Sequence, residues 1–268
     1  GTISHATDKA IIANITTSAD GQGTFTYNTG TNTTTVVTGE IGTTAKRLLA
    51  VNAASVNAKI QTFTGGIHAD TITLTGAGAT AKFAVGGDIS GTTVALTTNG
   101  ILEMAAGKNI TANITASTTN VTSVTCLGSC TITGNVGAIA GSELAGLNAA
   151  ATGIMQVDGN IAATTMTVLA GGTLKTTAAR TVEGLFANAG TLDLGGTLTV
   201  TDGGGHSDIS NATTAILKLA PNDQYTSGVV ISAGSDTQMN AGAKGTITPD
   251  ASFTSGTLKI IDDTGGAG

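Results

Sequence analysis

Short runs in which aliphatic side chains alternate with threonine recur along this chain, and each run predicts a β-strand with one buried face. Residues 71–75 read Thr-Ile-Thr-Leu-Thr, and residues 197–201 read Thr-Leu-Thr-Val-Thr. Successive side chains of a strand point to opposite faces, so Ile72 and Leu74 share one face while the threonines share the other. The β-branched threonine suits a pleated surface. The aliphatic face is therefore expected to line a core.

These strand-like runs return at a roughly regular interval, and glycine precedes most of them. In one unit, of the form Gly-x-Leu or Gly-Ile-Met, the aligned apolar positions are Leu102, Met155, Leu174 and Leu192. In a second unit, of the form Gly-Asn-Ile or Gly-x-x-Ile, the aligned apolar positions are Ile89, Ile110, Val136 and Ile161. Short strands that recur with a period of about twenty residues are typical of a solenoid.

We therefore predict an all-β fold, a right-handed parallel β-helix (β-solenoid) of about 10–12 coils that stack at about 4.8 Å. Glycine at the corners supplies the positive φ that tight turns require. A β-sandwich is the alternative, although it usually has longer strands and more aromatic residues. The predicted inward positions are Ile72, Leu74, Val85, Ile89, Leu102, Met104, Ile110, Ile154, Val157, Ile161, Leu174, Leu192, Leu194, Leu198 and Val200.

The chain is expected to divide into two regions. Residues 1–45 form an extended polar segment with the first strands, suited to capping the stack or to pairing with another subunit. Residues 46–268 form the repetitive solenoid. Helical patterns are weak, and only residues 46–59 and 138–151 are candidates for short helices.

Composition narrows the classes of function. The chain is 40% hydrophobic and 10% charged, with a net charge of −6, whereas disordered chains combine low hydrophobicity with high net charge. Arg47 and Arg180 are the two arginines and the lysines are scattered singly, so the clustered cations of a nucleic-acid interface are missing. No apolar run approaches the ~18–20 residues of a membrane-spanning helix. Nucleic acid and a membrane-spanning segment are therefore not expected.

The two cysteines, Cys126 and Cys130, lie close together in the sequence. A disulfide that closes a turn between two coils is the preferred interpretation, and a pair of free thiols is the alternative. A disulfide fits an oxidising, extracytoplasmic compartment. Because the loop is short, it would fix a local bend more than it would stabilise the whole fold.

The sequence contains none of the common catalytic motifs, neither Gly-x-Ser-x-Gly nor His-Glu-x-x-His nor a phosphate loop. We therefore expect no enzymatic activity and no cofactor. Sugar-cleaving β-helices need carboxylates on one face of consecutive coils, but the carboxylates here are isolated and mostly near glycine. We interpret the following as solvated turn residues: Asp70, Asp88, Glu103, Asp158, Glu183 and Asp193.

The densest polar cluster is the loop of residues 201–208, where Asp202, His206 and Asp208 flank three glycines. Its carboxylate and backbone oxygens are the hard ligands that Ca²⁺ prefers. An exposed loop between two coils is the simpler interpretation. The pair Asp262 and Asp263 is a weaker candidate.

One stretch resembles a known family. Residues 21–28 (Gly-Gln-Gly-Thr-Phe-Thr-Tyr-Asn), 37–43 (Val-Thr-Gly-Glu-Ile-Gly-Thr) and 46–52 (Lys-Arg-Leu-Leu-Ala-Val-Asn) look like the passenger repeat of rickettsia-type surface autotransporters, the outer-membrane protein B and surface cell antigen group. The resemblance is clearest over residues 21–52. It implies a secreted β-solenoid passenger at a bacterial cell surface, with a structural or adhesive role, and it transfers no catalytic residue.

Three functional hypotheses follow. The first is an extracellular stalk or adhesin whose partners are host-cell or other surface ligands. The second is a filament or surface-layer subunit that pairs with copies of itself or with neighbouring surface proteins, through open ends or through residues 1–45. The third, a carbohydrate-active β-helix, is disfavoured because the chain has no Trp on which a sugar could stack.

Overall fold

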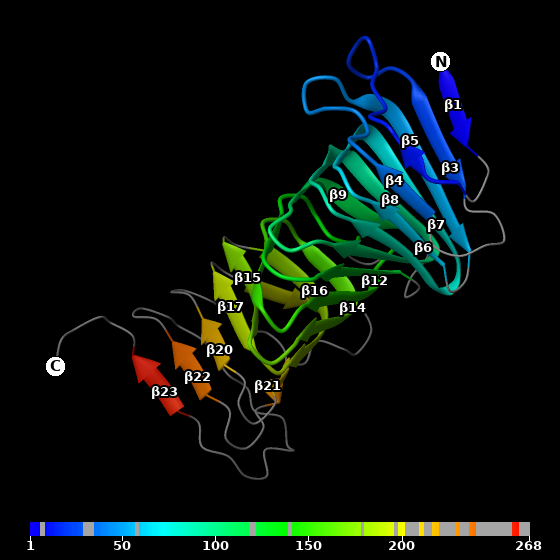
Figure 1. Ribbon diagram of the computed structural model, residues 1–268. Coiled ribbons are helices and arrows are strands. Elements are labelled where there is room, and N and C mark those ends of the chain that lie inside the picture. The colour runs from blue at the N-terminus through cyan, green and yellow to red at the C-terminus, as the bar shows by residue number, and fades with distance from the viewer. Residues whose placement is uncertain are drawn as a thin grey trace.

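The computed structural model describes residues 1–5, 9–28, 35–56, 59–117, 122–138, 141–177 and 180–195, followed by the backbone of six short strands between residues 198 and 262. Within these residues the fold is all-β and contains no helix. The strands lie one above another from the N-terminal end toward the C-terminal end (Figure 1).

In chain order the strands are β1 (Thr2–His5), β2 (Ile11–Ile12), β3 (Thr24–Asn28), β4 (Thr35–Thr38), β5 (Leu48–Val56), β6 (Ile60–Phe63), β7 (Ile67–Val85), β8 (Ile89–Met104), β9 (Ile110–Ala116), β10 (Ser123–Cys126), β11 (Cys130–Ile132), β12 (Leu144–Ala149), β13 (Gly153–Val157), β14 (Ile161–Val168), β15 (Gly172–Thr177), β16 (Arg180–Asn188), β17 (Thr191–Gly195), β18 (Leu198–Thr201), β19 (Ile209–Asn211), β20 (Ile216–Leu219), β21 (Val229–Val230), β22 (Asp236–Met239) and β23 (Lys259–Asp262).

Every ladder between these strands is parallel. Each strand pairs with one from the coil before it or the coil after it, as β3 does with β1 and β5. The predicted parallel β-solenoid is thereby confirmed, and the antiparallel β-sandwich is wrong.

Inward-facing side chains of one coil lie directly on those of the next. The clearest column consists of six isoleucines, each at most 7% exposed: Ile15, Ile41, Ile67, Ile89, Ile110 and Ile132. Full burial of each such side chain contributes about 1.5–3 kcal/mol. The column makes the core continuous from coil to coil.

The same column shows how many coils the chain makes. It continues from Ile132 through Val157 and Thr176 to Leu194, and the stack has about eight turns. The 10–12 coils are predicted for the whole chain, whereas this count ends at Leu194. Beyond Leu194, β20, β22 and β23 extend the ladder.

Asparagine and aspartate side chains fasten the corners between coils. The Asn109 backbone N–H donates to Asp88 Oδ1 at 2.8 Å, and the Asn160 N–H donates to Asn135 Oδ1 at 2.9 Å. The same bond joins three further pairs, Thr131 N–H to Asn109, Asn135 N–H to Asn113 and Thr181 N–H to Asn160. The recurrent Gly-Asn-Ile pattern therefore combines a corner, a side-chain bond to the next coil and an inward aliphatic residue.

Most predicted inward positions are confirmed. The following are at most 1% exposed: Ile72, Leu74, Val85, Ile89, Leu102, Met104, Ile110, Val157, Ile161, Leu174 and Leu192. The prediction that Ile154 faces inward is wrong, because Ile154 is 47% exposed while its neighbour Met155 is 1% exposed. Ile154 and Val157 are separated by an odd number of positions in one strand and so cannot share a face. The side chains of Leu194, Leu198 and Val200 lie outside the described residues.

Two alignments and two helices in the sequence prediction are wrong. Leu102 pairs with Val124, and Met155 pairs with Cys130, so Leu102 and Met155 belong to different columns. Val136 pairs with Ile114 and not with Ile110. The two candidate helices, residues 46–59 and 138–151, contain the strands β5 and β12 instead. Strands of the neighbouring coils pair with β5 and β12, and this pairing holds their alanines and leucines in extended backbone.

The N-terminal segment, residues 1–45, contributes strands to the same ladders as the rest. β1 and β3 continue into β5, and β2 and β4 continue into β6. The boundary at residue 45 stays a prediction.

Candidate functional site

The first described strand, β1, has a described partner on one side only. Among the described strands, β1 pairs only with β3. The Thr24 N–H donates to the Gly1 carbonyl at 2.9 Å, and alternate residues of a parallel strand bond to opposite sides. Ile3 therefore bonds toward β3, whereas Thr2 and Ser4 direct their backbone N–H and C=O groups away from the stack.

The core is only partly covered at this end. Ile3 stands in register with Phe25, yet Ile3 is 55% exposed and Phe25 is 0% exposed. Ile11 is partly buried against the core, and Ile12, which follows it, is 82% exposed. The inward column thus ends in an isoleucine that has no side chain above it among the described residues.

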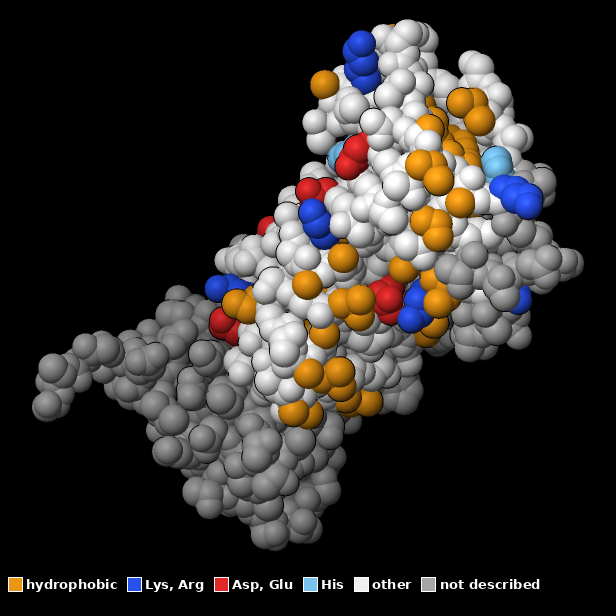
Figure 2. Space-filling model, viewed as in Figure 1, with side chains coloured by type: hydrophobic (Ala, Val, Ile, Leu, Met, Phe, Trp, Pro, Cys, Tyr) orange, Lys and Arg blue, Asp and Glu red, His pale blue; other side chains and the backbone are white. Residues whose placement is uncertain are grey.

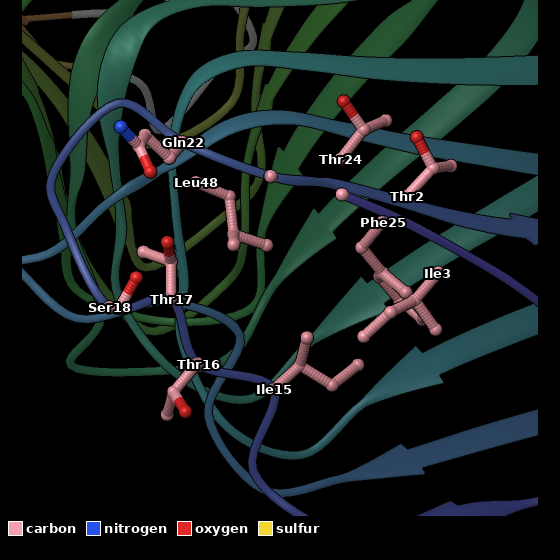
Figure 3. A pocket seen from close by; sticks show the side chains of 12 residues that line it. Thr2, Ile3, Ile15, Thr16, Thr17, Ser18, Gln22, Thr24, Phe25 and Leu48 are labelled. Atoms are coloured by element: carbon pink, nitrogen blue, oxygen red, sulfur yellow. The ribbon is translucent and has the colours of Figure 1, made fainter.

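A cavity of about 300 Å³ opens beside β1. Ile3, Ile15, Phe25 and Leu48 supply its apolar wall, and residues 16–18 form a polar rim (Figure 3). Ligand pockets usually span about 300–1,000 Å³, so this cavity is at the small end of that range.

Arg47 binds two aspartates, Asp20 and Asp70, next to the loop that borders this cavity. The Arg47 guanidinium lies 3.2 Å from Asp70 and 3.6 Å from Asp20. The Arg47 backbone N–H also donates to Asp20 Oδ1 at 2.8 Å, and this bond, with a smaller contribution from the guanidinium, lowers the pKa of Asp20 below its ordinary value. Asp20, Arg47 and Asp70 thus connect three consecutive coils.

A polar cluster joins Glu40, His68 and Ser90, again on three consecutive coils. His68 Nδ1 lies 2.6 Å from Ser90 Oγ, and His68 Nε2 lies 3.4 Å from Glu40 Oε2. Gly66 donates its N–H to Glu40 Oε2 at 2.9 Å. A Cβ on Gly66 would approach His68 Nε2 to 2.8 Å, so only glycine leaves room for the imidazole.

Serine, histidine and glutamate in this order have the connectivity of a nucleophile, a base and an orienting carboxylate. The His68 side chain, however, is only 9% exposed, and its ring nitrogen Nε2 lies close to Gly66. The arrangement can therefore fasten three coils together, and its burial leaves little access for a substrate.

The six predicted turn carboxylates fall into two groups. Asp88 and Asp158 lie at corners, where they bind the Asn109 N–H and the side chains of Gln156 and Thr177, respectively. The other four lie within strands, so the turn interpretation is wrong for them: Asp70 in β7, where it binds Arg47, Glu103 in β8, Glu183 in β16 and Asp193 in β17.

The strand carboxylates differ in their surroundings. Glu103 pairs with Lys82 of the preceding coil at 2.7 Å, and Asp193 lies 4.0 Å from Lys175. Glu183 is 3% exposed, which contradicts its interpretation as a solvated residue. Its inward position follows from the strand register, in which Val182 and Glu183 are both buried at a bend of β16.

Cys126 and Cys130 form a disulfide between the end of β10 and the start of β11, with their Cα atoms 6.2 Å apart. A shallow cavity of about 240 Å³ lies next to it and is lined in part by Ser129, Cys130 and the exposed Ile154. Asp202, His206, Asp208 and Asp263 lie outside the described residues. Among the residues that are described, no three His, Cys, Asp or Glu side chains gather where they could hold a metal ion.

No family model, curated protein or solved structure matches this chain. Within the described part of the chain, no helix has the length and apolar character needed to cross a membrane.

Proposed function

We propose that this chain is an extracellular structural and adhesive β-solenoid of a bacterial cell surface, and that it has no catalytic activity. The observation that carries the proposal is the uninterrupted column of inward aliphatic side chains from Ile15 to Val157. A stack of this kind gives an elongated body with broad faces, in which each coil depends mainly on its neighbours. Such a body suits a stalk or a contact surface.

The outward residues support the same proposal. The face seen in Figure 2 carries few charged side chains, and these are scattered. Some of the charged side chains join successive coils, as Lys82 and Glu103 do, and Lys175 and Asp193. Threonine hydroxyls also bond across coils, with Thr97 and Thr75 at 2.7 Å. These polar side chains hold the stack together, and a carboxylate already paired in this way is a poor candidate for acid–base catalysis of sugar cleavage.

The disulfide is consistent with the proposed location, because disulfides persist in oxidising, extracytoplasmic compartments. The resemblance of residues 21–52 to the passengers of surface autotransporters favours the outer surface of a bacterium over other extracellular settings. The proposed partners of the adhesive face are host-cell or other surface ligands.

Cell-surface exposure and attachment test this proposal together. Intact cells that naturally produce the chain are treated with proteinase K, and the chain is followed by immunoblot beside a cytosolic control protein. We expect loss of the chain while the control survives. Beads coated with the folded chain should bind target surfaces more than beads coated with heat-unfolded chain. A chain protected inside intact cells, or equal bead binding, would contradict the proposal.

A further inference from the structure

We infer that the shallow cavity beside the Cys126–Cys130 disulfide binds one uncharged sugar ring of a surface glycan. The inference rests on the proposed adhesive function and names the chemical class of the ligand. The cavity has a volume of about 240 Å³ and lies on the outward side of the coils that contain β9, β11 and β13. It is carried by four polar side chains and one exposed isoleucine.

Strand pairing brings the polar side chains of three consecutive coils together. Thr131 pairs with Gln156, and Ile132 pairs with Ile110, so that Asn109, Thr131 and Gln156 follow one another from coil to coil. Neighbouring coils lie about 4.8 Å apart, and alternate residues of a strand lie about 6.7 Å apart, so the lining covers roughly 10 Å by 7 Å. This area accommodates one six-membered sugar ring with its hydroxyl groups.

The disulfide holds one wall of the cavity in place. Ser129 lies within the short loop that Cys126 and Cys130 close. Because Cys130 pairs with Met155, Ser129 stands beside Ile154. A wall that is fixed before the ligand arrives lowers the entropic cost of binding.

Each polar side chain of the lining keeps a hydrogen-bonding group for a ligand. Asn109 Oδ1 accepts the Thr131 N–H at 3.0 Å, which orients the amide and leaves its Nδ2 donors open. Ser129 Oγ accepts the Ile154 N–H at 3.2 Å and keeps its own hydrogen. Gln156 Nε2 donates to the carboxylate two residues later at 2.9 Å, so its Oε1 acceptor remains. Within the described part of the chain, no other group bonds to these open atoms or to the Thr131 hydroxyl.

The chemistry of this lining favours a neutral sugar. None of the lining side chains is charged, so a charged ligand would lose hydration without gaining an ion pair. Sugar hydroxyl groups both donate and accept, as the lining does. Ile154 is 47% exposed and can contact the C–H face of the ring. It thereby supplies the apolar contact in a chain that has no Trp.

A peptide is a poorer occupant than a sugar. Extended peptides bind by adding a strand to a sheet edge, but this cavity lies on the face of a ladder whose backbone groups are already paired between coils. The Gly107 N–H, for example, donates to the Ser129 carbonyl at 2.7 Å. The volume is also below the ~300 Å³ of most ligand sites, which suits a single ring whose neighbours in the glycan lie outside the cavity.

The test removes contacts without disturbing the strands. Thr131→Val keeps the β-branched shape and removes the hydroxyl, and Ile154→Ala removes the apolar contact. Thr115→Val is the matched control for the first, because Thr115 is also a half-buried outward threonine of a strand but does not line the cavity. Leu169→Ala is the control for the second, because Leu169 is also 47% exposed.

The probe is a printed array of neutral oligosaccharides together with sialylated and sulfated ones. We expect the unchanged chain to bind at least one neutral oligosaccharide, and isothermal titration with that oligosaccharide gives the Kd. Thr131→Val and Ile154→Ala should each raise this Kd about twofold to tenfold, as the loss of one neutral contact does. Thr115→Val and Leu169→Ala should leave it unchanged. Urea unfolding verifies that all four variants are folded.

Mild periodate provides a second test, because it cleaves the vicinal diols of sugars. Treatment of the target surface should reduce the attachment of beads coated with the chain. Undiminished attachment would assign the adhesion to a protein ligand and overturn the inference.

The array and the titrations can overturn it as well. They do so if no neutral oligosaccharide binds, if only charged ones bind, if both cavity variants keep the Kd, or if the controls raise it equally. The proposed function fails separately. A surface-exposed chain whose beads attach without binding sugar overturns only the inference, and a chain protected inside intact cells overturns the proposed function whatever the array shows.

Discussion

Replacing Ile67 by alanine tests whether the isoleucine column carries the stability of the stack. Ile67 is 0% exposed and lies between Ile41 and Ile89 in register. The change removes three carbons, which at about 0.8 kcal/mol per buried methylene is about 2.4 kcal/mol. Because the coils above and below hold the backbone in place, a cavity remains, and the free energy of unfolding should fall by about 2–5 kcal/mol.

The assay combines urea unfolding, followed by far-UV circular dichroism, with amide hydrogen exchange. Each coil contacts mainly its neighbours, so protection should fall most in the coils of Ile41 and Ile89 and least near Leu174. Ile154→Ala is the matched control, because Ile154 is also an isoleucine in a strand but is 47% exposed. It should lose about half the transfer free energy, roughly 1 kcal/mol, without leaving a cavity.

Two results would refute this reasoning. One is a cost for Ile154→Ala equal to that for Ile67→Ala, which would mean that the inward and outward faces are assigned wrongly. The other is an even loss of amide protection along the chain, which would mean that the coils do not depend mainly on their neighbours.

Three further predictions concern the corners. Asn135→Ala should lower the free energy of unfolding by about 0.5–2 kcal/mol in urea titrations, and Asn135→Asp, which keeps the Oδ acceptor, should cost less; equal costs would contradict the corner bond. A thiol-reactive dye should label the denatured chain only after reduction of Cys126–Cys130, and reduction should cost at most about 2 kcal/mol, since the loop is short; labelling without reductant would refute the disulfide. The bond from the Arg47 N–H lowers the pKa of Asp20. The bond therefore stabilises the fold at pH values above the ordinary carboxyl pKa of about 4, and this stabilisation is lost as pH falls below that value. The Tm difference between the unchanged chain and Asp20→Asn should shrink below about pH 4, and a constant difference would exclude this cause.

The strand pattern and the core could be predicted from the sequence because they depend on local alternation. Ile72 and Leu74, flanked by threonines, are both fully buried. The predicted alignment of Met155 with Leu174 and of Leu174 with Leu192 is the register of the structure. Glycine-flanked alternation fixes these registers, since a slip by one residue would turn every aliphatic side chain outward.

The repeat pattern predicts the wrong register where a corner differs in its number of residues from the corners of the other coils. The repeat aligns Val136 with Ile110, but the turn that contains the disulfide shifts the pairing, so that Ile132 pairs with Ile110. The apolar character of Ile154 predicts an inward side chain, although Met155 and Val157 of the same strand face inward and Ile154 faces outward. Residues 46–59 looked helical because alanine and leucine favour helices, and pairing with β3 and β7 overrides that preference.

The polar clusters could not be predicted because they join residues that lie a whole coil apart in the sequence. Glu40, His68 and Ser90 meet only because Ile41, Ile67 and Ile89 are stacked. A search for aliphatic residues at the interval from Ile15 to Ile41 would also have reached Ile67, and would have placed Glu40 above Gly66.

In-register stacking of coils is the central claim, and a disulfide between two outward threonines tests it most directly. Thr75 and Thr97 are paired in register on β7 and β8, with their hydroxyls 2.7 Å apart. Thr75→Cys with Thr97→Cys should oxidise to a cross-coil disulfide, because neighbouring parallel strands lie about 4.8 Å apart, within the range that a disulfide spans. Thr75→Cys with Thr93→Cys is the control, displaced along the strand by about 13 Å.

The readout is tryptic digestion followed by mass spectrometry without reduction, since cleavage after Lys82 separates the two positions. The account predicts that the peptides containing positions 75 and 97 stay linked and that those containing positions 75 and 93 separate. Linkage in the control pair, or no linkage in the Thr75 and Thr97 pair, would contradict the parallel, in-register stack on which the proposed function rests.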